Sequence, residues 1–425
     1  MEKKKHVIVG CGTAALSALK RMRQNNAADD IEVVSMEPHL PYSPTSLPYL
    51  ISGKIQESEI SMVTESFFDR MRAVWARGRG KRVERLDTGK SQVIYESGER
   101  EAYDSLLIAT GSEPVVPSIP GLKQEEALQL RTLDHARALI DKIKGTRTAI
   151  ILGAGLIGMH VAQCLAEKGM KVKVVEMQPR ILPSYFDADA SPMIQRVLEQ
   201  HGITFFVNKQ VAEVYSKKGF VGVALKGGDA LEADLLLVAT GVRPRTSLVN
   251  GSGIEVDNGI LVDRQMRTNV SNVFAAGDVA AAKSFFTGKH GLNPILPSAA
   301  EQGNVAGSNM VGEVKEYEGW LPMNTFNFFG HRAVSVGETT PVEGDEVLAE
   351  ANGKKETYRK LIYRQGKLVG ATFLSTDVDA GVFQYLVRKR VEISQYKNSL
   401  LALPRETSLW LMREAERKET VSIED

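Results

Sequence analysis

Cysteine is scarce in this chain of 425 residues, which contains only Cys11 and Cys164. Two thiols cannot form a disulfide framework, and they cannot supply the four ligands of an iron–sulfur cluster. So few cysteines are typical of a reducing compartment, and we expect a cytoplasmic protein. Five histidines are scattered without the Cys/His spacing of a metal site, so no bound metal is predicted. These are His39, His135, His201, His290 and His331.

An excess of charge and a long uninterrupted apolar run are missing as well. The formal net charge is +1, which argues against a nucleic-acid or acidic-membrane partner. Gly10 and Gly12 interrupt the apolar run that follows the N-terminal lysines. His160 and Gln163 lie within the apolar stretch 149–166. We therefore predict neither a signal peptide nor a membrane-spanning segment, and the length predicts two or three domains.

The chain does contain an internal repeat. The first copy includes VIVGCGTAALSALKRM, IEVVSMEP and YDSLLIATGSEP, and the second includes AIILGAGLIGMHVAQCLAEKG, KVKVVEMQP and ADLLLVATGVRP. Each copy opens with a β-branched run, passes through Gly-x-Gly-x-x-Gly/Ala and continues into a helical pattern. Each then has a second strand followed by a glutamate and a later apolar strand that closes on Ala-Thr-Gly. The repeat predicts two strand–turn–helix units of a doubly wound parallel sheet.

Both glycine motifs are suited to dinucleotide phosphates. The first glycine makes the tight turn, the second lets a pyrophosphate approach the backbone, and the third position must be small for helix and strand to pack. The phosphates then lie at a helix N-terminus, where free N–H groups and the helix dipole favour negative charge. Glu37 and Glu176 are placed to accept hydrogen bonds from ribose hydroxyls. Two motifs in matching context predict two dinucleotide sites.

The two units, together with TNVSNVFAAGD at 268–278, resemble the FAD-dependent pyridine nucleotide–disulfide oxidoreductase superfamily over nearly the whole chain. The resemblance implies an α/β fold with two Rossmann-like, glutathione reductase-like dinucleotide-binding domains and a small α+β C-terminal interface domain. It implies a discontinuous FAD-binding domain at 1–118 and 246–322, an NAD(H)-binding domain at 119–245 and an interface domain at 323–425. FAD and NAD(H) are the implied cofactors.

The resemblance also assigns binding residues one by one. For FAD these are Gly10, Gly12, Thr13, Ala14, Ala15, Glu37, Thr45, Val83, Ala109, Thr110, Gly111, Arg131, Gly277, Asp278, Ser298 and Ala299. For NAD(H) they are Gly153, Gly155, Leu156, Ile157, Gly158, Glu176, Tyr185 and Gly241. Asp278 would hold the ribityl chain, and the helix that begins near Ser298 would face the flavin pyrimidine. Glu176 favours NADH, because a carboxylate repels a 2′-phosphate.

One segment departs from the family pattern. Disulfide reductases of this type carry a Cys-x4-Cys pair after the second strand, and peroxide and coenzyme A disulfide reductases keep one cysteine there. In this chain PYSPTSLPY at 41–49 puts Thr45 at that position, and a threonine cannot cycle through thiolate, sulfenate or disulfide. Cys11 lies in the phosphate turn, and Cys164 lies in the helix after the second turn. The flavin is therefore the predicted redox centre, without a thiol.

No side chain is assigned a certain catalytic role. Relatives often carry a glutamate where this chain has His160, which would contact the nicotinamide carboxamide or accept a proton near the flavin. The alternative is a hydrogen-bonded histidine packed on a helix. Tyr185 is similarly open between packing near the NADH adenosine and a surface position in a loop.

The C-terminal region is predicted to form a third unit. Leu361–Tyr363 and Leu368–Ala371 flank a turn and predict a hairpin, and helices are expected over Gly381–Arg390 and Leu400–Arg417. The region looks like the interface domain of NADH oxidase-like and rubredoxin reductase-like flavoproteins and of the flavin part of NADH nitrite reductases. It predicts a homodimer or a subunit of a hetero-oligomeric complex, and the apolar cluster 409–412 offers a docking surface for a partner.

Three functions remain in competition at this point. The leading hypothesis is an FAD-dependent NAD(H):acceptor oxidoreductase that exchanges electrons with a ferredoxin-like or other iron–sulfur protein or subunit. Its sharpest form is the flavin subunit of a multisubunit 2-oxoacid oxidoreductase of the phenylglyoxylate dehydrogenase type. The second is a thiol-free NADH oxidase that produces H2O2, and the third is a flavin-bound, redox-sensing interaction protein.

Overall fold

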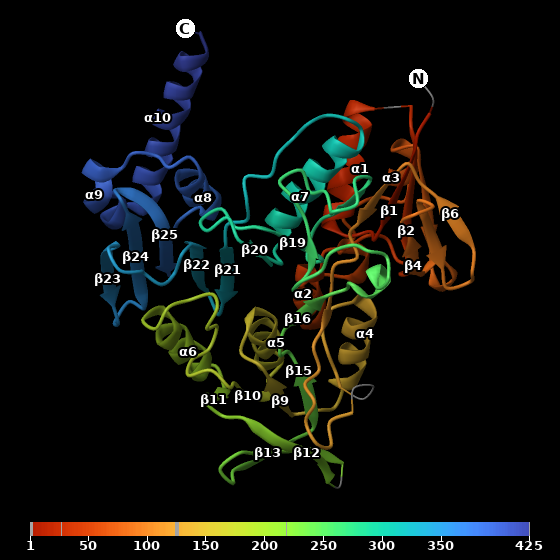
Figure 1. The fold of residues 1–425 in the computed structure, drawn as a ribbon. Coiled ribbons are helices and arrows are strands. Elements are labelled where there is room, and N and C mark those ends of the chain that lie inside the picture. Colours follow the sequence, from red (N-terminus) through yellow and green to blue (C-terminus); the bar gives the residue numbers. More distant parts are fainter. Residues whose placement is uncertain (1–2, 27, 124–126, 218, 425) are drawn as a thin grey trace. The chain divides into compact units, whose positions relative to one another are not determined.

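The computed structural model describes residues 3–26, 28–123, 127–217 and 219–424 (Figure 1). Its internal contacts divide the chain into two compact units. The first unit consists of Met1–Val115 and Val242–Leu321, and the second consists of Val116–Gly241 and Pro322–Asp425. The division into FAD-binding, NAD(H)-binding and interface domains at the boundaries given above stays a prediction.

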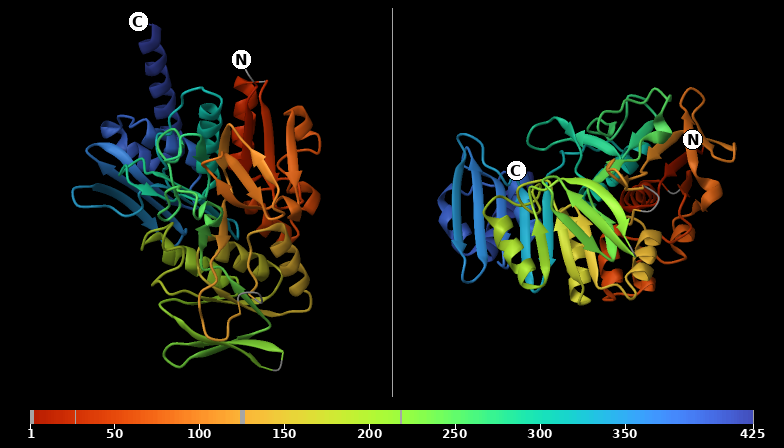
Figure 2. Two further views of the ribbon diagram at one scale, coloured as in Figure 1. Left: turned by 45° about the vertical axis from the view of Figure 1, so that its right-hand side comes forward. Right: turned by 90° about the horizontal axis from the view of Figure 1, so that it is seen from below.

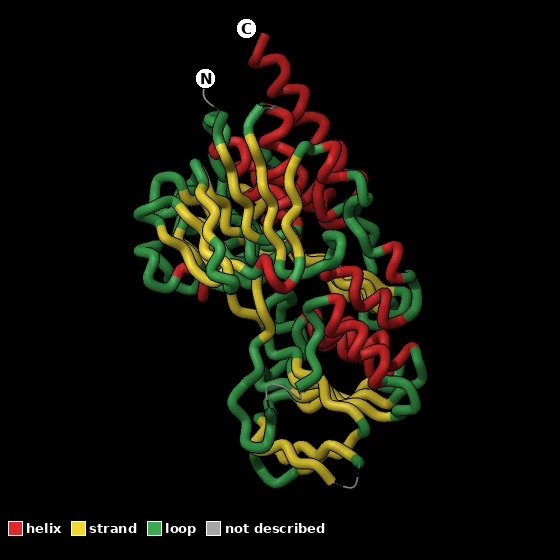
Figure 3. Tube along the Cα trace, turned by 90° about the vertical axis from the view of Figure 1, so that its right-hand side faces the viewer, coloured by secondary structure: helices red, strands yellow, loops and turns green. Residues whose placement is uncertain are grey.

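The first unit is built on a parallel sheet of five strands in the order β18–β7–β1–β2–β3. Strands of this unit run side by side in yellow in Figure 3. The strands are β1 (Lys5–Val9), β2 (Asp30–Ser35), β3 (Ala73–Arg77), β7 (Ser105–Ile108) and β18 (Val273–Ala275). Residues 7–9 of β1 and 106–108 of β7 are apolar and buried. Strands covered on both faces read as continuous apolar runs, which is why both repeats contain such runs.

Helices α1 (Thr13–Asn25) and α7 (Leu296–Met310) pack closely together in this unit. Two glycines four residues apart on α7 make the approach possible. A Cβ atom on Gly303 would lie 2.1 Å from the Ala14 carbonyl oxygen, and one on Gly307 would lie 2.6 Å from that of Ala18. Both distances are far below van der Waals contact, so only glycine fits at these positions.

Short strands and two helices complete the first unit. They are β4 (Val83–Asp87), β5 (Gln92–Tyr95), β6 (Arg100–Ala102), β8 (Ser112–Pro114), β16 (Val242–Pro244), β17 (Ile260–Leu261), β19 (Ala280–Lys283) and β20 (His290–Gly291), with helices α2 (Leu47–Ser52) and α3 (Phe67–Arg70). The strand pairs are antiparallel except for the parallel pair β17–β19. The pairing of β8 with β16 joins the two segments of the chain that make up this unit.

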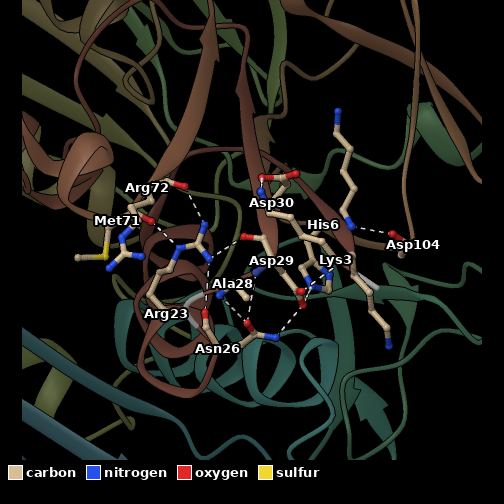
Figure 4. A network of polar contacts seen from close by, with 12 residues as sticks. Lys3, His6, Arg23, Asn26, Ala28, Asp29, Asp30, Met71, Arg72 and Asp104 are labelled. Carbon is tan, nitrogen blue, oxygen red and sulfur yellow. Dashed lines mark hydrogen bonds and ion pairs between the residues drawn. The ribbon is translucent and has the colours of Figure 1, made fainter. Parts of the chain in front are cut away.

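A buried polar network lies at the amino ends of β1, β2 and β7 (Figure 4). The fully buried ring of His6 satisfies both nitrogens, with Nδ1 2.7 Å from Ser105 Oγ and Nε2 2.9 Å from Asp29 Oδ2. Burial alone would raise the pKa of Asp29, but hydrogen bonds from His6 and from the Lys4 N–H hold it below its ordinary value. The network lies at the opposite end of the strands from the glycine turn and anchors the sheet.

The second unit contains a parallel sheet in the order β11–β10–β9–β15. Its strands are β9 (Thr148–Leu152), β10 (Lys171–Val175), β11 (Ile203–Phe206) and β15 (Leu235–Val238), and its helices are α4 (Leu133–Lys142), α5 (Leu156–Glu167) and α6 (Ala190–Gln200). A three-stranded antiparallel sheet follows, with β12 (Val211–Lys217), β13 (Phe220–Leu225) and β14 (Ala230–Ala233). The order β9, α5, β10 repeats the order β1, α1, β2, as the sequence repeat predicts.

The same unit holds an antiparallel sheet in the order β21–β22–β25–β24–β23, and α6 lies beside it (Figure 2). Its elements are β21 (Met323–Phe328), β22 (His331–Gly337), β23 (Glu346–Asn352), β24 (Thr357–Arg364), β25 (Lys367–Leu374), α8 (Ala380–Arg388), α9 (Lys397–Ala402) and α10 (Pro404–Glu424). The hairpin predicted around 364–367 is present as β24 and β25.

The single helix predicted over Leu400–Arg417 is wrong in one respect. The structure contains two helices there, because α9 ends at Ala402 and Pro404 begins α10. Proline lacks a backbone N–H and fits the first turn of a helix but not its interior, so a helix boundary at this position is expected. Within the described ranges, no helix combines the length and apolar character needed to cross a bilayer.

Candidate dinucleotide-binding sites

The first glycine turn connects β1 to α1 in the first unit. Gly10 has a φ of 115°, and a Cβ atom there would lie 2.1 Å from the Ala109 carbonyl oxygen, where the chain leaves β7. A Cβ atom on Gly12, in contrast, would meet no atom within 4 Å. Gly12 is the N-cap residue of α1 and provides no side-chain cap to the first N–H groups of the helix. An uncapped helix start beside open space is suited to a pyrophosphate.

The second glycine turn has the same construction in the second unit. Gly153 has a φ of 102°, and a Cβ atom there would lie 2.4 Å from the Ala239 carbonyl oxygen, just after β15. Gly155, which precedes α5 without a side-chain cap, again faces open space. A Cβ atom on Gly158 would lie 2.2 Å from the Gly153 carbonyl oxygen, so the third position must be glycine here. The buried Ala15 occupies the third position of the first motif. Both turns fit a dinucleotide.

The two acids follow the second strand of each unit. Glu37 lies two residues after β2 and accepts a hydrogen bond of 2.6 Å from the Tyr42 hydroxyl. Glu176 directly follows β10, and its carboxylate accepts the Ala154 N–H at 2.7 Å and the Gln178 N–H at 2.8 Å. Glu176 is thus held against its own glycine turn, at the carboxyl edge where open α/β sheets bind nucleotides.

The Ala-Gly-Asp segment converges with the first glycine turn. The Ala276 N–H donates to the Ile108 carbonyl at 3.1 Å, and the Gly277 N–H donates to Gln302 of α7 at 2.8 Å. A Cβ atom on Gly277 would lie 3.2 Å from Ala14 Cβ. The Ser112 hydroxyl donates to Asp278 Oδ2 at 2.8 Å. Segments far apart in the sequence therefore meet around the start of α1.

Most of the residues predicted to bind FAD lie near one another in the structure, but Val83 and Arg131 belong to other parts of the fold. Those it brings together in the first unit are Gly10, Gly12, Thr13, Ala14, Ala15, Ala109, Thr110, Gly111, Gly277, Asp278, Ser298 and Ala299, around the starts of α1 and α7. Val83 lies apart from these in the antiparallel sheet, at the start of β4. Arg131 belongs to the second unit. These binding roles stay predictions.

The predicted NAD(H) residues all lie in the second unit. Leu156 and Ile157 form the first turn of α5, and Gly241 follows β15 with a φ of 114°. Tyr185 is half-buried, and burial raises the pKa of its hydroxyl. Its backbone N–H donates to the Leu182 carbonyl at 3.0 Å, which places it in a tight loop after β10.

His160 lies on α5, about one turn after the start of the helix. Its ring meets the ring of Phe326 from β21 edge to face, with centroids 5.0 Å apart. Burial lowers the pKa of His160 to about 4, so the imidazole is neutral near pH 7. A neutral ring can donate or accept a hydrogen bond but supplies no positive charge. Both sequence-based alternatives for His160 stay open.

The environments of Thr45 and of the two cysteines agree with the prediction that no thiol takes part in the redox chemistry. Thr45 is exposed in a short 3₁₀ turn, and its hydroxyl lies 2.7 Å from Ser43 Oγ. Burial, with a contribution from the Glu37 carboxylate, raises the pKa of Cys11 to about 12. Because the thiolate is the nucleophilic form, this raised pKa disfavours reaction of Cys11 at neutral pH. Cys164 is buried within α5.

Sequence reasoning missed the residues that hold the predicted ones in place. Tyr42 restrains Glu37, Ser112 restrains Asp278, and Gln302 restrains Gly277. Ser112 and Asp278 are 166 positions apart, and no local pattern links them. Tyr42 lies only five positions from Glu37, and this short separation is the one feature of the sequence that could have suggested their contact.

Comparison with known proteins places these features in a family. The family model described as pyridine nucleotide-disulphide oxidoreductase matches residues 4–303, and the model described as rubredoxin NAD+ reductase C-terminal domain matches residues 322–389. The epsilon subunit of NADH-dependent phenylglyoxylate dehydrogenase from Aromatoleum evansii is 39% identical over 407 residues, which covers 95% of this chain and 96% of that subunit.

An NADH oxidase from Methanocaldococcus jannaschii is 32% identical over 320 residues, with 73% of this chain and 71% of the relative covered. The crystal structure of the ferredoxin reductase for the CYP199A2 system from Rhodopseudomonas palustris superposes with a TM-score of 0.81 at 26% identity. It covers 88% of this chain and 91% of that chain.

These matches confirm the fold class, the enzyme class and the cofactors predicted from the sequence. The chain is an NAD(H)-linked flavin oxidoreductase whose cofactors are FAD and NAD(H). A family model that covers most of the chain and a relative that covers nearly all of it lead to one conclusion: the chain belongs to the pyridine nucleotide-disulphide oxidoreductase family.

Proposed function

We propose that this chain is a flavin subunit that exchanges electrons between NAD(H) and an iron–sulfur protein or subunit, in a 2-oxoacid dehydrogenase of the phenylglyoxylate type. The similarity to the epsilon subunit, which extends over 95% of this chain and 96% of that subunit, supports the assignment. The match of residues 322–389 to a rubredoxin reductase domain supports an iron–sulfur partner.

One observation carries the proposal: the chain combines two glycine turns of matching geometry with a threonine, Thr45, where related disulfide reductases carry a redox cysteine. When bound, FAD accepts a hydride from NADH and can release the two electrons singly, which suits a junction with a one-electron carrier. Cys11 is the thiol in the first turn, and its raised pKa keeps it protonated. The proposal therefore includes no pair of cysteines in this chain that would accept electrons from the reduced flavin.

The residues of the two turns bind and orient, and they do not react. Gly12 and Gly155 leave space beside uncapped helix starts, where N–H groups stabilise the phosphates. Glu176 is held in position to accept ribose hydroxyls, so we propose a preference for NADH over NADPH. Asp278, fixed by Ser112, is proposed to hold the ribityl chain of the flavin.

The larger assembly belongs to the proposal too. A homodimer or a place in a hetero-oligomeric complex is proposed through the C-terminal sheet and helices, and the predicted domain division accompanies it. The cytoplasmic location stays a prediction from the cysteine content.

An anaerobic electron-exchange assay tests the proposal. The purified flavoprotein is mixed with NADH and an oxidised two-cluster [4Fe–4S] ferredoxin, and in a second arm with NAD+ and the reduced ferredoxin. We expect ferredoxin-dependent oxidation of NADH or reduction of NAD+ in at least one arm. A flavin that reacts readily with NADH but exchanges electrons with no iron–sulfur carrier would overturn the proposal.

A thiol-free NADH oxidase is the second candidate, favoured by the similarity to the Methanocaldococcus jannaschii enzyme. Fast oxygen consumption by the isolated chain with NADH, with H2O2 formed in equal amount, would support it. If oxygen uptake is slow while a ferredoxin is turned over quickly, this candidate fails.

A further inference from the structure

A buried ion pair joins the loop before α6 to the C-terminal sheet of the second unit. Asp187, Tyr358 and Lys360 are 6%, 2% and 5% exposed. The Asp187 carboxylate pairs with the Lys360 ammonium group and accepts the Tyr358 hydroxyl at 3.1 Å. The Tyr358 hydroxyl also lies 3.3 Å from Asp189 Oδ2. A buried lysine is uncommon unless it is paired, and the electron transfer proposed above makes no use of this one.

The position of these partners is fixed by the strand that carries them. Tyr358 and Lys360 are two residues apart on β24, so both side chains lie on the same face of the sheet. β24 is paired on both sides, with β23 and with β25. The cation and the hydroxyl are therefore presented by a rigid element.

Asp187 uses its other oxygen to organise α6. Oδ1 accepts the N–H of Ala190 at 2.8 Å and that of Asp189 at 3.1 Å, at the start of the helix. Such capping satisfies backbone donors that a helix start leaves unpaired. One carboxylate thus ties the beginning of α6 to β24.

The loop that Asp187 ends is tied to the second glycine turn at its other end. The Leu182 N–H donates to the carbonyl of Ala154, which lies between Gly153 and Gly155, at 2.8 Å. The N–H groups of Tyr185 and Phe186 both donate to the Leu182 carbonyl, at 3.0 and 3.1 Å. The loop 182–187 is therefore a compact bridge between β24 and the glycine turn.

The bridge reaches the ribose-binding acid as well. The Ala154 N–H donates to Glu176 Oε2 at 2.7 Å, so the residue that receives the Leu182 hydrogen bond also holds Glu176. One ion pair and a set of hydrogen bonds, joined by the backbone of the loop 182–187 and of Ala154, thus connect Lys360 to Glu176. Displacement of the loop would disturb both the phosphate turn and the acid.

We propose that Asp187, Tyr358 and Lys360 are positioning residues that hold the loop 182–187 against the second glycine turn, so that the C-terminal sheet sets the affinity for the nicotinamide nucleotide. This inference rests on the proposed nucleotide site at Gly153–Gly158. The C-terminal sheet then contributes to nucleotide affinity through the loop 182–187, and the proposal requires no direct contact between these three side chains and the nucleotide.

The test compares Lys360→Met with Lys367→Met in the full-length, FAD-loaded protein. Lys367 lies in the same sheet and pairs with Glu392 at an exposed position, so it is a matched control. NAD+ binding is measured by calorimetry, alongside flavin content, melting temperature, and KM and kcat for NADH with ferricyanide as acceptor. We expect Lys360→Met to weaken NAD+ binding about tenfold, with KM raised, and flavin content and kcat nearly unchanged. The Lys367→Met variant should match the wild type.

Two further variants keep the test decisive if Lys360→Met folds poorly. Tyr358→Phe removes only a hydroxyl and should weaken NAD+ binding by a smaller factor. Combining Asp187→Asn with Lys360→Met removes both charges, and it should bind NAD+ more tightly than Lys360→Met alone, because no buried charge is left unpaired.

The inference is overturned if folded variants lose thermal stability but bind NAD+ as tightly as the wild type, since the cluster would then be structural only. A wild-type protein that binds FAD but no NAD+ would instead overturn the nucleotide site on which the inference rests.

Discussion

At the scale of single residues, the proposed chemistry depends on two carboxylates held by hydrogen bonds and on a cysteine whose thiol stays protonated. Glu176 receives two backbone N–H groups, and Asp278 receives the hydroxyl of Ser112. Desolvation and the Glu37 carboxylate raise the pKa of Cys11 to about 12, which favours the protonated thiol. The sequence indicated Glu176 and Asp278 because their motifs are local. It did not indicate Ser112, whose partner is 166 positions away.

Glu176→Gln should reduce the preference for NADH. The amide cannot bind ribose hydroxyls as strongly as a carboxylate and no longer repels a 2′-phosphate, so the ratio of kcat/KM for NADH over NADPH should fall roughly tenfold. Steady-state kinetics with ferricyanide would measure it.

Glu37→Gln is the matched control in the first unit, and it should lower FAD retention while leaving the NADH/NADPH ratio unchanged. An unchanged ratio in Glu176→Gln would contradict the assigned role of Glu176.

His160 should make the stability of the protein depend on pH. Its pKa is about 4 in the folded chain and 6.5 without burial, so the unfolded chain binds the extra proton first as the pH falls. Stability from this group is therefore complete above pH 6.5 and is lost progressively between pH 6.5 and 4, by up to about 3 kcal/mol.

His160→Gln removes the titrating group. The melting temperature of the variant minus that of the wild type should therefore increase as the pH is lowered from 7 to 4.5. Scanning calorimetry at a series of pH values measures this difference. A constant difference across the range would show that burial does not suppress protonation of His160.

At the scale of elements, the repeat was predictable and the additions to it were not. Strands β1, β7, β9 and β15 are apolar runs because parallel strands are covered on both faces, and the glycine motifs marked the turns between strand and helix. The antiparallel additions β4–β6 and β12–β14 gave no comparable pattern. The break between α9 and α10 could have been read from Pro404, whose ring ends one helix and begins another.

Gly303→Ala tests the contact between α1 and α7. The new Cβ atom would lie 2.1 Å from a backbone oxygen of α1, so the two helices must separate. Overpacking of this kind costs about 1–3 kcal/mol, and FAD retention should fall because both helix starts carry predicted flavin residues. Thermal unfolding and the flavin-to-protein absorbance ratio would measure both effects.

Gly80→Ala is the control, because a Cβ atom at Gly80 would meet no neighbour within 4 Å. Equal stability and flavin content in the two variants would contradict the proposed close packing of α1 against α7.

At the scale of the whole molecule, the chain contains two glycine turns that fit dinucleotides, and Thr45 lies where related disulfide reductases carry a cysteine. The sequence repeat predicted both sites because each is encoded locally. It could not predict the link from Lys360 to Asp187, since two single residues in different regions carry no shared pattern. The similarity over nearly the full length of a dehydrogenase subunit makes electron exchange with a partner the function to test first.

The most direct measurement is an anaerobic reductive titration of the purified protein and of its Cys11→Ser/Cys164→Ser variant. The account predicts yellow protein whose FAD absorbance is fully bleached by two electrons per flavin, whether from NADH or dithionite, in both forms. A requirement for four electrons per flavin in the wild type would reveal a redox-active thiol pair. That result, or a colourless protein unable to bind FAD, would contradict the central claim.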